Sequence, residues 1–511
     1  MRWRPSRLSS GGRLSYGGGD LCVCGEQSIF SSSMCQIRFL SAPSGARMRA
    51  DDRHNPDSVQ MLLHECFCIR FQRQNTYRSR FTNTIGFTLI VSVLVVFAAI
   101  CFHASLVGAA RHAPPDSAPE PVDAPELKSQ PRGLVFDVTH HGAVDDGDTE
   151  SGSGFLAAWK AACDHGERAT FYVPEGKYHV GPVEFSGPCK NNQSPKIVIR
   201  GNLIAPSKLQ SFPSKTWIQF SHLNRFSITG DLDKTNFDAR GAVEAWKQHS
   251  CQHSSRCKTL IPSLKFDHVS HGTIRNISLS NAKGFHLVIH ESSNVNVHNV
   301  IVSSPEDSPN TDGIHVSHSS NINISSSTIG VGDDCVSIIA GSVNVTVYDV
   351  TCNPGHGISI GSLGKTKNEE DVSGISVKKC KIKKTKNGIR IKTWAGSTSS
   401  NAYNMTFDDI ELTDVSNPII IDQKYCPNHK CDTSKPSKVK IKDVTFKNVR
   451  GTYKSDYAVS LLCSPSVPCE NVKLVDINLT PTHEEDDEDW REGNLNLNGA
   501  IDGLQVINSN F

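Results

Sequence analysis

An apolar pattern that returns through the second half of the chain limits its folding more than any other feature. From a common start, apolar residues stand three, five, eight and ten positions later, usually with Asn at two and Asn or Asp at seven. Copies recur every 23 to 34 residues and begin at Ser292, Ser319, Ser342, Val372, Ala402, Pro436 and Cys469, with a last copy at Ile501. Such a period indicates stacked repeats, because no single unit can bury its own apolar face.

The units are too short for helical repeats and too rich in alternating Val, Ile, Thr and Asn. A parallel β-helix accounts for them: each turn adds short strands to parallel sheets, alternate residues point inward, and neighbouring turns lie about 4.8 Å apart. We therefore predict an all-β chain, a single-stranded parallel β-helix or solenoid, over residues 132–511.

A second pattern places charged side chains at short apolar strands of consecutive units. The strands are Gly313–Val316, Cys335–Ile338, Gly357–Ile360 and Gly388–Ile391. The charged residues in front of them or within them are Asp312, Asp333, Asp334, His356, Arg390 and Lys392. If the units stack, these six side chains form one site. Carboxylates and an imidazole can carry out acid/base cleavage of a sugar polymer, and two cations can bind it if it is acidic.

The geometry of a β-helix refines this prediction. Aligned by their strands, Asp312, Asp334 and His356 take one position on three successive turns. Strict alternation would turn the two aspartates inward, since they share parity with inward residues of the following strand. We therefore expect all three at the bend that enters the strand. Arg390 and Lys392 alternate with apolar residues of their own strand, so we expect them to face outward.

Each of these residues also has a purely structural interpretation. An Asp beside Gly often only forms a turn, and lysines on a strand are often only a solvated face. Eight basic residues and no acidic one lie between Lys378 and Lys392, yet the net charge of the chain is +1. No global charge therefore selects a polyanion, and we expect no nucleic-acid partner. The turn-forming interpretation suits a single Asp better than it suits Asp312, Asp333 and Asp334 together.

Four motifs occur in a fixed order: Asn310-Thr-Asp-Gly313, Gly332-Asp-Asp-Cys335, Gly355-His-Gly357 and Arg390-Ile-Lys392. Together they resemble the signature of the polygalacturonases, which are pectin-hydrolysing glycosidases. The resemblance covers about residues 134 to 480 and is greatest to plant members. Around Lys392-Thr-Trp-Ala and from Asp422 to Cys431 it favours the exo-acting branch.

The resemblance implies a right-handed β-helix that hydrolyses α-1,4-linked galacturonan with inversion. Asp333 matches the general acid, whereas Asp312 and Asp334 match the carboxylates that activate water. The neighbouring carboxylates oppose a third ionisation, so Asp333 is expected to keep its proton and activity to peak on the acidic side. Stacked turns also permit the shorter carboxylate spacing of retaining enzymes, so the stereochemistry rests on the resemblance alone.

The resemblance also implies how substrate is held. His356 matches a residue that tunes the acid, Arg390 and Lys392 match binders of the substrate carboxylate, and Tyr425 matches a ring that positions the sugar. The implied partner is a polysaccharide, galacturonan or pectin, and the protein is expected to act as a monomer. No cofactor is implied, and no CxxC pair or histidine cluster suggests a metal site.

Three rivals remain open. A non-catalytic pectin-binding β-helix would not favour clustered acids. A rhamnogalacturonan hydrolase shares the fold, although the Arg390/Lys392 pair favours uniformly acidic galacturonan. A pectate lyase would use Ca²⁺ and an arginine base, whereas the Asp-Asp-Cys and Gly-His-Gly sequences are hydrolase features.

The N-terminal 131 residues lack the repeat pattern and divide into three segments. Residues 1–84 lack periodicity and are assigned no fold, as a disordered or misannotated extension. Residues 85–110 contain no Asp, Glu, Lys or Arg and follow a basic flank, which is typical of a signal peptide or a signal anchor. A proline-rich linker, 111–131, leads to the catalytic domain. We expect a secreted, cell-wall protein, tied to a membrane only if residues 85–110 stay uncleaved.

Cysteine usage agrees with export, because eleven of seventeen cysteines follow residue 130. Disulfides are plausible for Cys163/Cys189, Cys251/Cys257, Cys335/Cys352, Cys426/Cys431 and Cys463/Cys469, with Cys380 left as a buried thiol. Of these we predict the Cys335–Cys352 bond specifically. Six sequons permit glycosylation, at Asn192, Asn276, Asn323, Asn344, Asn404 and Asn478.

Overall fold

The computed structural model of the chain describes residues 133–243, 245–246, 260–427, 431–482 and 494–511. These belong to Asp123–Phe511, one of the two units into which the chain divides. The predicted extension (1–84), signal or anchor segment (85–110) and linker (111–131), and the Cys251/Cys257 pair, lie outside the described residues. Among the residues that are described, no helix is long and apolar enough to cross a membrane.

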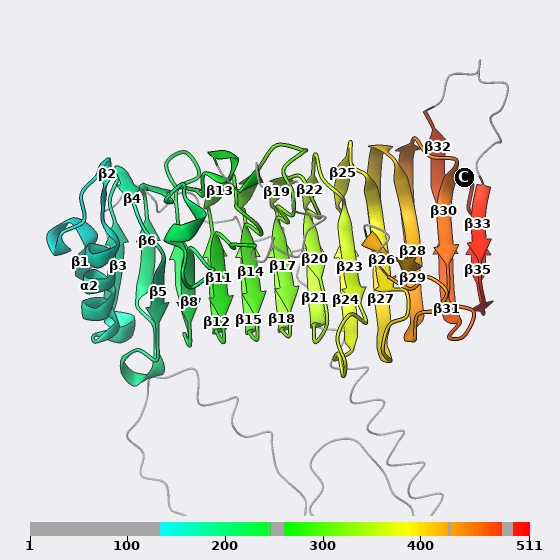
Figure 1. The fold of residues 1–511 in the computed structure, drawn as a ribbon, viewed down its shortest axis with the longest axis horizontal. Coiled ribbons are helices and arrows are strands. Elements are labelled where there is room, and N and C mark those ends of the chain that lie inside the picture. Colours follow the sequence, from blue (N-terminus) through cyan, green and yellow to red (C-terminus); the bar gives the residue numbers. More distant parts are fainter. Residues whose placement is uncertain (1–132, 244, 247–259, 428–430, 483–493) are drawn as a thin grey trace, which may run out of the picture. The chain divides into compact units, whose positions relative to one another are not determined.

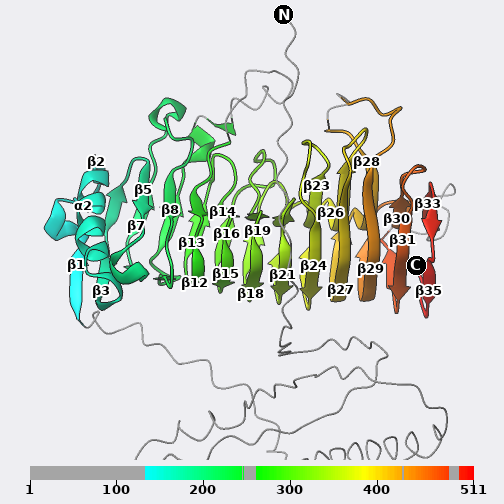
Figure 2. The same ribbon diagram turned by 90° about the horizontal axis from the view of Figure 1, so that it is seen from below.

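Two sheets of parallel strands run along the stacked turns (Figures 1 and 2). The 11-stranded sheet consists of β5 (Val183–Ser186), β8 (Ile218–Ser221), β11 (Leu264–Asp267), β14 (Leu287–His290), β17 (Ile314–Ser317), β20 (Val336–Ile338), β23 (Ile358–Leu363), β26 (Asn387–Trp394), β28 (Asn417–Tyr425), β30 (Tyr457–Leu462) and β33 (Asn494–Asn498).

The 24-stranded sheet consists of β1 (Leu134–Asp137), β2 (Asp146–Glu150), β3 (Ala169–Val173), β4 (Lys177–His179), β6 (Lys196–Ile199), β7 (Asn202–Ile204), β9 (Ser227–Thr229), β10 (Asn236–Asp238), β12 (Ser270–Arg275), β13 (Ser278–Ser280), β15 (Ser293–His298), β16 (Ile301–Ser303), β18 (Ser320–Ser325), β19 (Thr328–Gly330), β21 (Val343–Tyr348), β22 (Thr351–Cys352), β24 (Val372–Lys378), β25 (Lys381–Lys383), β27 (Ser400–Val415), β29 (Val439–Tyr453), β31 (Cys469–Val475), β32 (Asn478–Pro481), β34 (Ile501–Asp502) and β35 (Gln505–Ile507). A typical turn adds two strands to this sheet, such as β15 and β16, and one to the smaller sheet, such as β17. The predicted parallel β-helix is confirmed.

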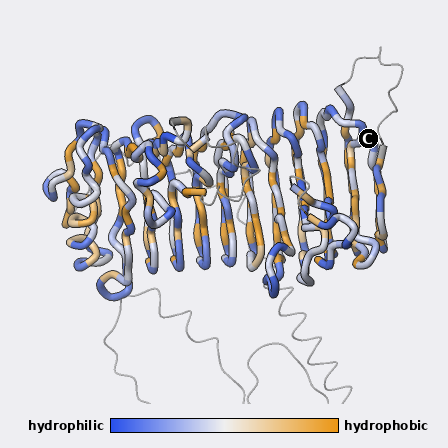
Figure 3. The backbone as a smooth tube through the Cα atoms, in the orientation of Figure 1, coloured by the Kyte–Doolittle hydropathy of each residue, from blue (hydrophilic) through white to orange (hydrophobic). Residues whose placement is uncertain are grey.

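Apolar residues at equivalent positions form columns inside the helix. In the 11-stranded sheet, Ile314, Val336, Ile358, Ile389 and Ile419 pair in register on successive turns. All five are almost completely buried. Bands of apolar residues therefore follow the turns (Figure 3). Each such side chain contributes about 1.5–3 kcal/mol by leaving water, so the repeated columns hold the turns together.

The repeated Asn and Asp residues have a backbone role. Two and seven positions after each repeat start, the backbone has a positive φ, as at Asn294 (55°) and Asn299 (52°) and again at Asn344 (55°) and Asp349 (54°). Asn and Asp tolerate this left-handed conformation better than most residues because their short polar side chains bond locally. The polar positions of the repeat therefore mark bends between strands.

One predicted repeat start is wrong. Strand β27 pairs with β29 so that Ala402 stands opposite Ile441, and the repeat starts there rather than at Pro436. The apolar pattern alone cannot separate two starts that lie five positions apart. Val444 and Phe446 stand eight and ten positions after Pro436, but they also stand three and five positions after Ile441. The polar offsets remove the ambiguity: Asp443 (φ 54°) and Asn448 (φ 51°) take the left-handed positions of the turn that begins at Ile441.

Helix α2 (Gly152–Cys163), which the repeat pattern does not predict, lies over the N-terminal end of the β-helix (Figure 1). It buries Phe155, Ala158, Trp159 and Ala162, whose helical spacing forms one apolar face. Trp159 packs edge-on against Phe171 of β3, with ring centroids 5.7 Å apart. Short 3-10 helices span Val138–His141, Gly166–Arg168, Lys190–Asn192, Leu209–Ser211 and Gly241–Val243.

Four of the five candidate cysteine pairs are disulfide-bonded: Cys163–Cys189, Cys335–Cys352, Cys426–Cys431 and Cys463–Cys469. The specific prediction for Cys335 and Cys352 is thus confirmed. Cys380 is a buried free thiol, as expected, and burial raises its pKa to about 12. A thiol with that pKa stays protonated and is a poor nucleophile.

Candidate active site

The site lies where the chain enters the strands of the 11-stranded sheet. Because Ile314, Val336 and Ile358 pair in register, the residues two positions earlier, Asp312, Asp334 and His356, stand at equivalent bends of three consecutive turns. The backbone ties the bends together: Gly313 N donates to Asp334 O at 2.9 Å, and His356 N donates to Asp333 O at 2.7 Å. The predicted stacking of this group is confirmed.

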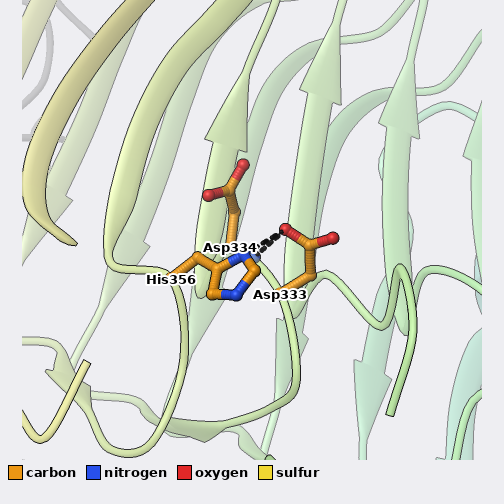
Figure 4. A group of neighbouring side chains, drawn as sticks. All are labelled: Asp333, Asp334 and His356. Atoms are coloured by element: carbon orange, nitrogen blue, oxygen red, sulfur yellow. Dashed lines mark hydrogen bonds and ion pairs between the residues drawn. The ribbon is translucent and has the colours of Figure 1, made fainter. Parts of the chain in front are cut away.

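Asp333 and His356 form a pair (Figure 4). The His356 Nδ1 atom lies 3.0 Å from Asp333 Oδ1, and the side chain of Asp333 is 21% exposed. The Asp334 N–H donates to the same oxygen at 2.9 Å, and Asn310 Nδ2 donates to the other oxygen at 3.3 Å. Asp333 is therefore oriented on both oxygens while water and a ligand can still reach it.

The glycines on both sides of His356 are required by close packing. A Cβ on Gly355 would meet the Cys335 sulfur at 2.7 Å, and a Cβ on Gly357 would meet Asn387 O at 2.1 Å. Gly357 also has φ +85°, a conformation that other residues rarely adopt. The Gly-His-Gly sequence thus brings the imidazole against Asp333, beside the Cys335–Cys352 disulfide.

Asp334 points away from that pair (Figure 4) and is buried with two cations. Arg390 Nη2 donates to its Oδ1 at 3.0 Å, Lys392 Nζ donates to its Oδ2 at 2.7 Å, and Ser359 Oγ donates to Oδ1 at 2.7 Å. Burial opposes the ionisation of Asp334, but the charges of Lys392 and Arg390 outweigh it and lower the pKa of this carboxyl. Asp334 is consequently a carboxylate at working pH.

These contacts exclude the alternative interpretation of the two cations as a solvated face. Arg390 and Lys392 do lie on the outward row of β26, but their side chains are only 12% and 7% exposed and both are engaged by Asp334. They are therefore not a solvated face. Any substrate carboxylate that they bind shares them with Asp334.

Asp312 has a different environment. It is buried, and its Oδ2 accepts a hydrogen bond from Ser337 Oγ at 2.8 Å. Burial, followed by the nearby charges of Asp333 and Asp334, raises the pKa of Asp312 well above its usual range. The three aspartates thus differ: Asp334 is ionised between cations, Asp312 tends to hold a proton, and Asp333 is the most exposed of the three.

Tyr425 closes the cationic side of the site. Its ring centroid is 5.4 Å from Lys392 Nζ and 5.9 Å from Arg390 Cζ, so the ring faces both cations. Trp394, paired with Tyr425 across the strands, packs edge-on against it at 5.6 Å and donates from Nε1 to Ser362 Oγ at 2.9 Å. An aromatic surface therefore adjoins the charged residues.

Sequence reasoning missed five residues of this site: His315, Ser337, Ser359, Trp394 and Asp422. Their signal was available, because each occupies an outward position of the same sheet, as Arg390 and Lys392 do. Asp422 stands opposite Lys392 on the next turn, and burial raises its pKa.

Asp333, Asp334 and His356 also have the composition of a metal-ligand group, with ligand atoms within 4.8 Å of one another. The geometry does not suit a cation. Asp334 already accepts hydrogen bonds from two buried positive groups, which would repel a metal ion bound to the same carboxylate. The three residues fit acid/base chemistry better.

A parallel β-helix with clustered carboxylates, an imidazole and an aromatic surface defines a carbohydrate-cleaving enzyme of the acid/base type. Residues 163–491 match the model of the glycosyl hydrolases family 28. Similarity to individual proteins agrees: an exopolygalacturonase of Arabidopsis thaliana, clone GBGA483, is 42% identical over 354 residues, spanning 69% of this chain and 78% of that protein. An exopolygalacturonase of Zea mays is 42% identical over 356 residues, spanning 69% and 85%. The chain belongs to glycosyl hydrolase family 28.

Solved structures resemble the fold at lower identity. An endo-xylogalacturonan hydrolase of Aspergillus tubingensis superposes with a TM-score of 0.60 at 21% identity, covering 72% of this chain and all of that one. A polygalacturonase of Erwinia carotovora gives 0.57 at 22% identity, covering 72% and 98%. At such identities the likeness concerns the fold, the right-handed parallel β-helix.

Proposed function

We propose that this glycoside hydrolase is a polygalacturonase that hydrolyses the α-1,4-linked galacturonan of pectin with inversion, acting from chain ends. The names of the similar plant proteins support the substrate and the exo mode. The chain spans 78% and 85% of the first two of these proteins, so most of their length has a counterpart here. The acidic substrate also matches the cations and the ring of the site.

Acid catalysis is assigned to Asp333. It is the most exposed of the three carboxyl groups and the one that His356 contacts, at 3.0 Å. A proton on Asp333 passes to the glycosidic oxygen as the sugar bond breaks. His356 helps to orient this carboxyl. The contact between Asp333 and His356, beside an ionised and buried Asp334, is the observation that carries the proposal.

Base catalysis is assigned to Asp334, with Asp312 next to it. An ionised carboxylate accepts the proton that the attacking water loses, and Asp334 is held ionised by Lys392 and Arg390. The same cations and the Tyr425 ring are placed to bind the substrate carboxylate and sugar face. Neutral or fully esterified polymers would lack the matching negative charge.

Secretion to the cell wall belongs to the same proposal. Four described disulfides suit an oxidising compartment. Asn192, Asn344, Asn404 and Asn478 of the sequons are exposed and open to glycosylation. Release by cleavage within residues 85–110 would yield the soluble enzyme, and mass spectrometry of its N-terminus and glycans tests this.

Product analysis tests the enzymatic proposal. Purified protein is incubated with polygalacturonate, fully methyl-esterified pectin and rhamnogalacturonan, and early products are separated by size. We expect galacturonic acid monomer from polygalacturonate at the first time points. With inversion, NMR should show that the monomer released from the α-linked polymer is first formed as the β-anomer. Mixed oligomers would mean an endo mode, and preferred cleavage of rhamnogalacturonan would favour the rival hydrolase. Binding without cleavage of any of them would favour a pectin-binding protein.

A further inference from the structure

The two buried carboxyl groups of the site, Asp312 and Asp334, are held in the same way, each by a serine hydroxyl. Ser337 Oγ donates to Asp312 Oδ2 at 2.8 Å, and Ser359 Oγ donates to Asp334 Oδ1 at 2.7 Å. The two serines pair with each other in register on β20 and β23. Each aspartate is therefore held by the serine of the following turn, and the repeat has produced the same arrangement twice.

The side chain behind each serine differs. Ser359 accepts a hydrogen bond from Arg390 Nε at 3.3 Å, and Arg390 stands opposite it on the next strand. Ser337 instead contacts Nδ1 of His315 at 2.7 Å, its neighbour on the preceding strand. We call the two series of hydrogen-bonded side chains arms. The Asp334 arm runs through Ser359 to the Arg390 guanidinium, and the Asp312 arm runs through Ser337 to the His315 imidazole. The arm of Asp334 always carries a positive charge, whereas the arm of Asp312 carries one only if the His315 imidazole is protonated.

The surroundings of His315 keep its imidazole neutral. The side chain is 13% exposed, and Phe285 stacks on the ring with centroids 4.5 Å apart and an angle of 10°. Burial lowers the pKa of His315 to about 4. The charged or titratable groups that face it are Asp312, Asp334, His290 and Lys392.

The two aspartates differ in the positive charge that surrounds them. Asp334 meets two permanent cations, whereas no Lys or Arg of the described residues makes a hydrogen bond with Asp312, which is instead influenced by the charges of Asp333 and Asp334 and, less strongly, by Lys392. A carboxylate that loses a proton in such a place would be buried without a paired charge, which is costly. The two arms therefore favour opposite protonation states.

We propose that His315 and Ser337 are positioning residues that orient Asp312 by hydrogen bonding without adding a positive charge, so that burial keeps Asp312 a neutral carboxylic acid while Asp334 remains ionised. This rests on the proposed function, in which water attacks near both groups. Asp334 takes the proton that water loses, and Asp312 keeps its own and orients the water by hydrogen bonding. The unequal division of roles comes from the side chain that contacts each serine: a neutral imidazole contacts Ser337 from the preceding strand, whereas a guanidinium contacts Ser359 from the following strand.

Direct titration tests this without relying on activity. The protein is labelled with ¹³C at aspartate carboxyl carbons, and Asp312 is identified by its absence in Asp312→Asn. We expect its signal to titrate well above the ordinary value near 3.9. A signal that titrates at the ordinary value would overturn the inference. Because the measurement needs no substrate, it remains decisive even if the protein cleaves no galacturonan, an outcome that would contradict only the proposed function.

Two substitutions should move that titration in opposite directions. His315→Lys supplies a cation next to Ser337 and Asp312, and should lower the titration of Asp312 by about one pH unit or more. Ser337→Ala removes a donor that favours the carboxylate, and should raise it. The alkaline limb of kcat/KM should move with each. No movement in folded His315→Lys, or a downward one in Ser337→Ala, would contradict the role assigned here.

A matched control exists on the other sheet. His298 Nδ1 lies 3.1 Å from Ser325 Oγ, the same cross-strand His–Ser pair far along the turn from the site. His298→Lys adds an equal charge and should leave the Asp312 titration in place. An equal shift would mean that net charge, not the His315 arm, is responsible. If His315→Lys does not fold, Ser337→Ala and the wild-type titration still decide.

Discussion

The Lys392 ammonium donates a hydrogen bond to the Asp334 carboxylate at 2.7 Å, and only 7% of the Lys392 side chain and 3% of the Asp334 side chain are exposed. Charges buried to this extent depend on each other, since neither can turn to water when its partner is lost. This pair therefore matters for folding. It also explains how a carboxylate can stay ionised inside the site.

Replacing Lys392 should accordingly cost stability. We expect Lys392→Met to lower the free energy of unfolding by about 3–5 kcal/mol, as measured by denaturant titration, because it leaves Asp334 with Arg390 alone. Adding Asp334→Asn should restore part of that loss without restoring activity. Lys440→Met is the control: Lys440 pairs with Glu470 at 2.7 Å, but both are over a third exposed, and such pairs contribute about 0–1 kcal/mol. Equal losses in both lysine variants would contradict the coupling.

Asp333→Asn should abolish acid catalysis while keeping the shape of the site. We expect the rate on polygalacturonate to fall by roughly 10²–10⁴-fold, with oligogalacturonate binding retained, because the amide cannot protonate the leaving oxygen. Initial rates and calorimetric titration give the two values. Asp349→Asn, an exposed bend position that tolerates Asn, should keep the parent rate. A variant Asp333→Asn within a few-fold of the parent would remove Asp333 from the acid role.

The Cys335–Cys352 disulfide closes a 17-residue separation next to the Asp333 and His356 bends. Replacing both cysteines by Ala should cost about 3 kcal/mol of unfolding free energy. It should also lower kcat in the protein that remains folded, because the bend that carries His356 is released. Removing Cys463–Cys469, which closes a separation of 6, should cost stability but spare kcat. Identical kcat in the two variants would show that the first disulfide is structural only.

Acid should weaken the fold partly through His286. The Nδ1 atom of this buried imidazole lies 3.1 Å from Asp312 O, and burial lowers the pKa of His286 from its ordinary value of 6.5 to about 4. Between these values the unfolded chain binds a proton that the folded chain excludes, so stability falls as the pH drops from about 6.5 towards 4. The full effect is on the order of 3 kcal/mol.

His286→Asn should flatten that part of the stability curve, measured by denaturant titration at several pH values. Its absolute stability is expected to fall at every pH because hydrogen bonds are lost, so the slope is the informative quantity. His271→Asn, at an exposed left-handed position, should keep the parent slope. An unchanged slope in His286→Asn would mean that other buried groups dominate.

Much of this protein follows from its sequence. The apolar offsets require inward columns such as Ile314, Val336 and Ile358, and only a stack of parallel turns provides them. Once the turns stack, the residues two positions before those strands must meet at neighbouring bends. The positions of Asp312, Asp334 and His356, and the disulfide between Cys335 and Cys352, were therefore predictable from local pattern.

The tertiary structure decided what pattern leaves open. An apolar pattern that repeats after five positions could not separate Pro436 from Ile441 as a repeat start, whereas strand pairing does. Alternation placed Arg390 and Lys392 outward, but it carries no information on which group their flexible side chains reach across two turns. Contacts between turns depend on side-chain direction and burial in three dimensions. That is why only the folded chain shows that both cations pair with Asp334, whereas Asp312 accepts its hydrogen bond from Ser337.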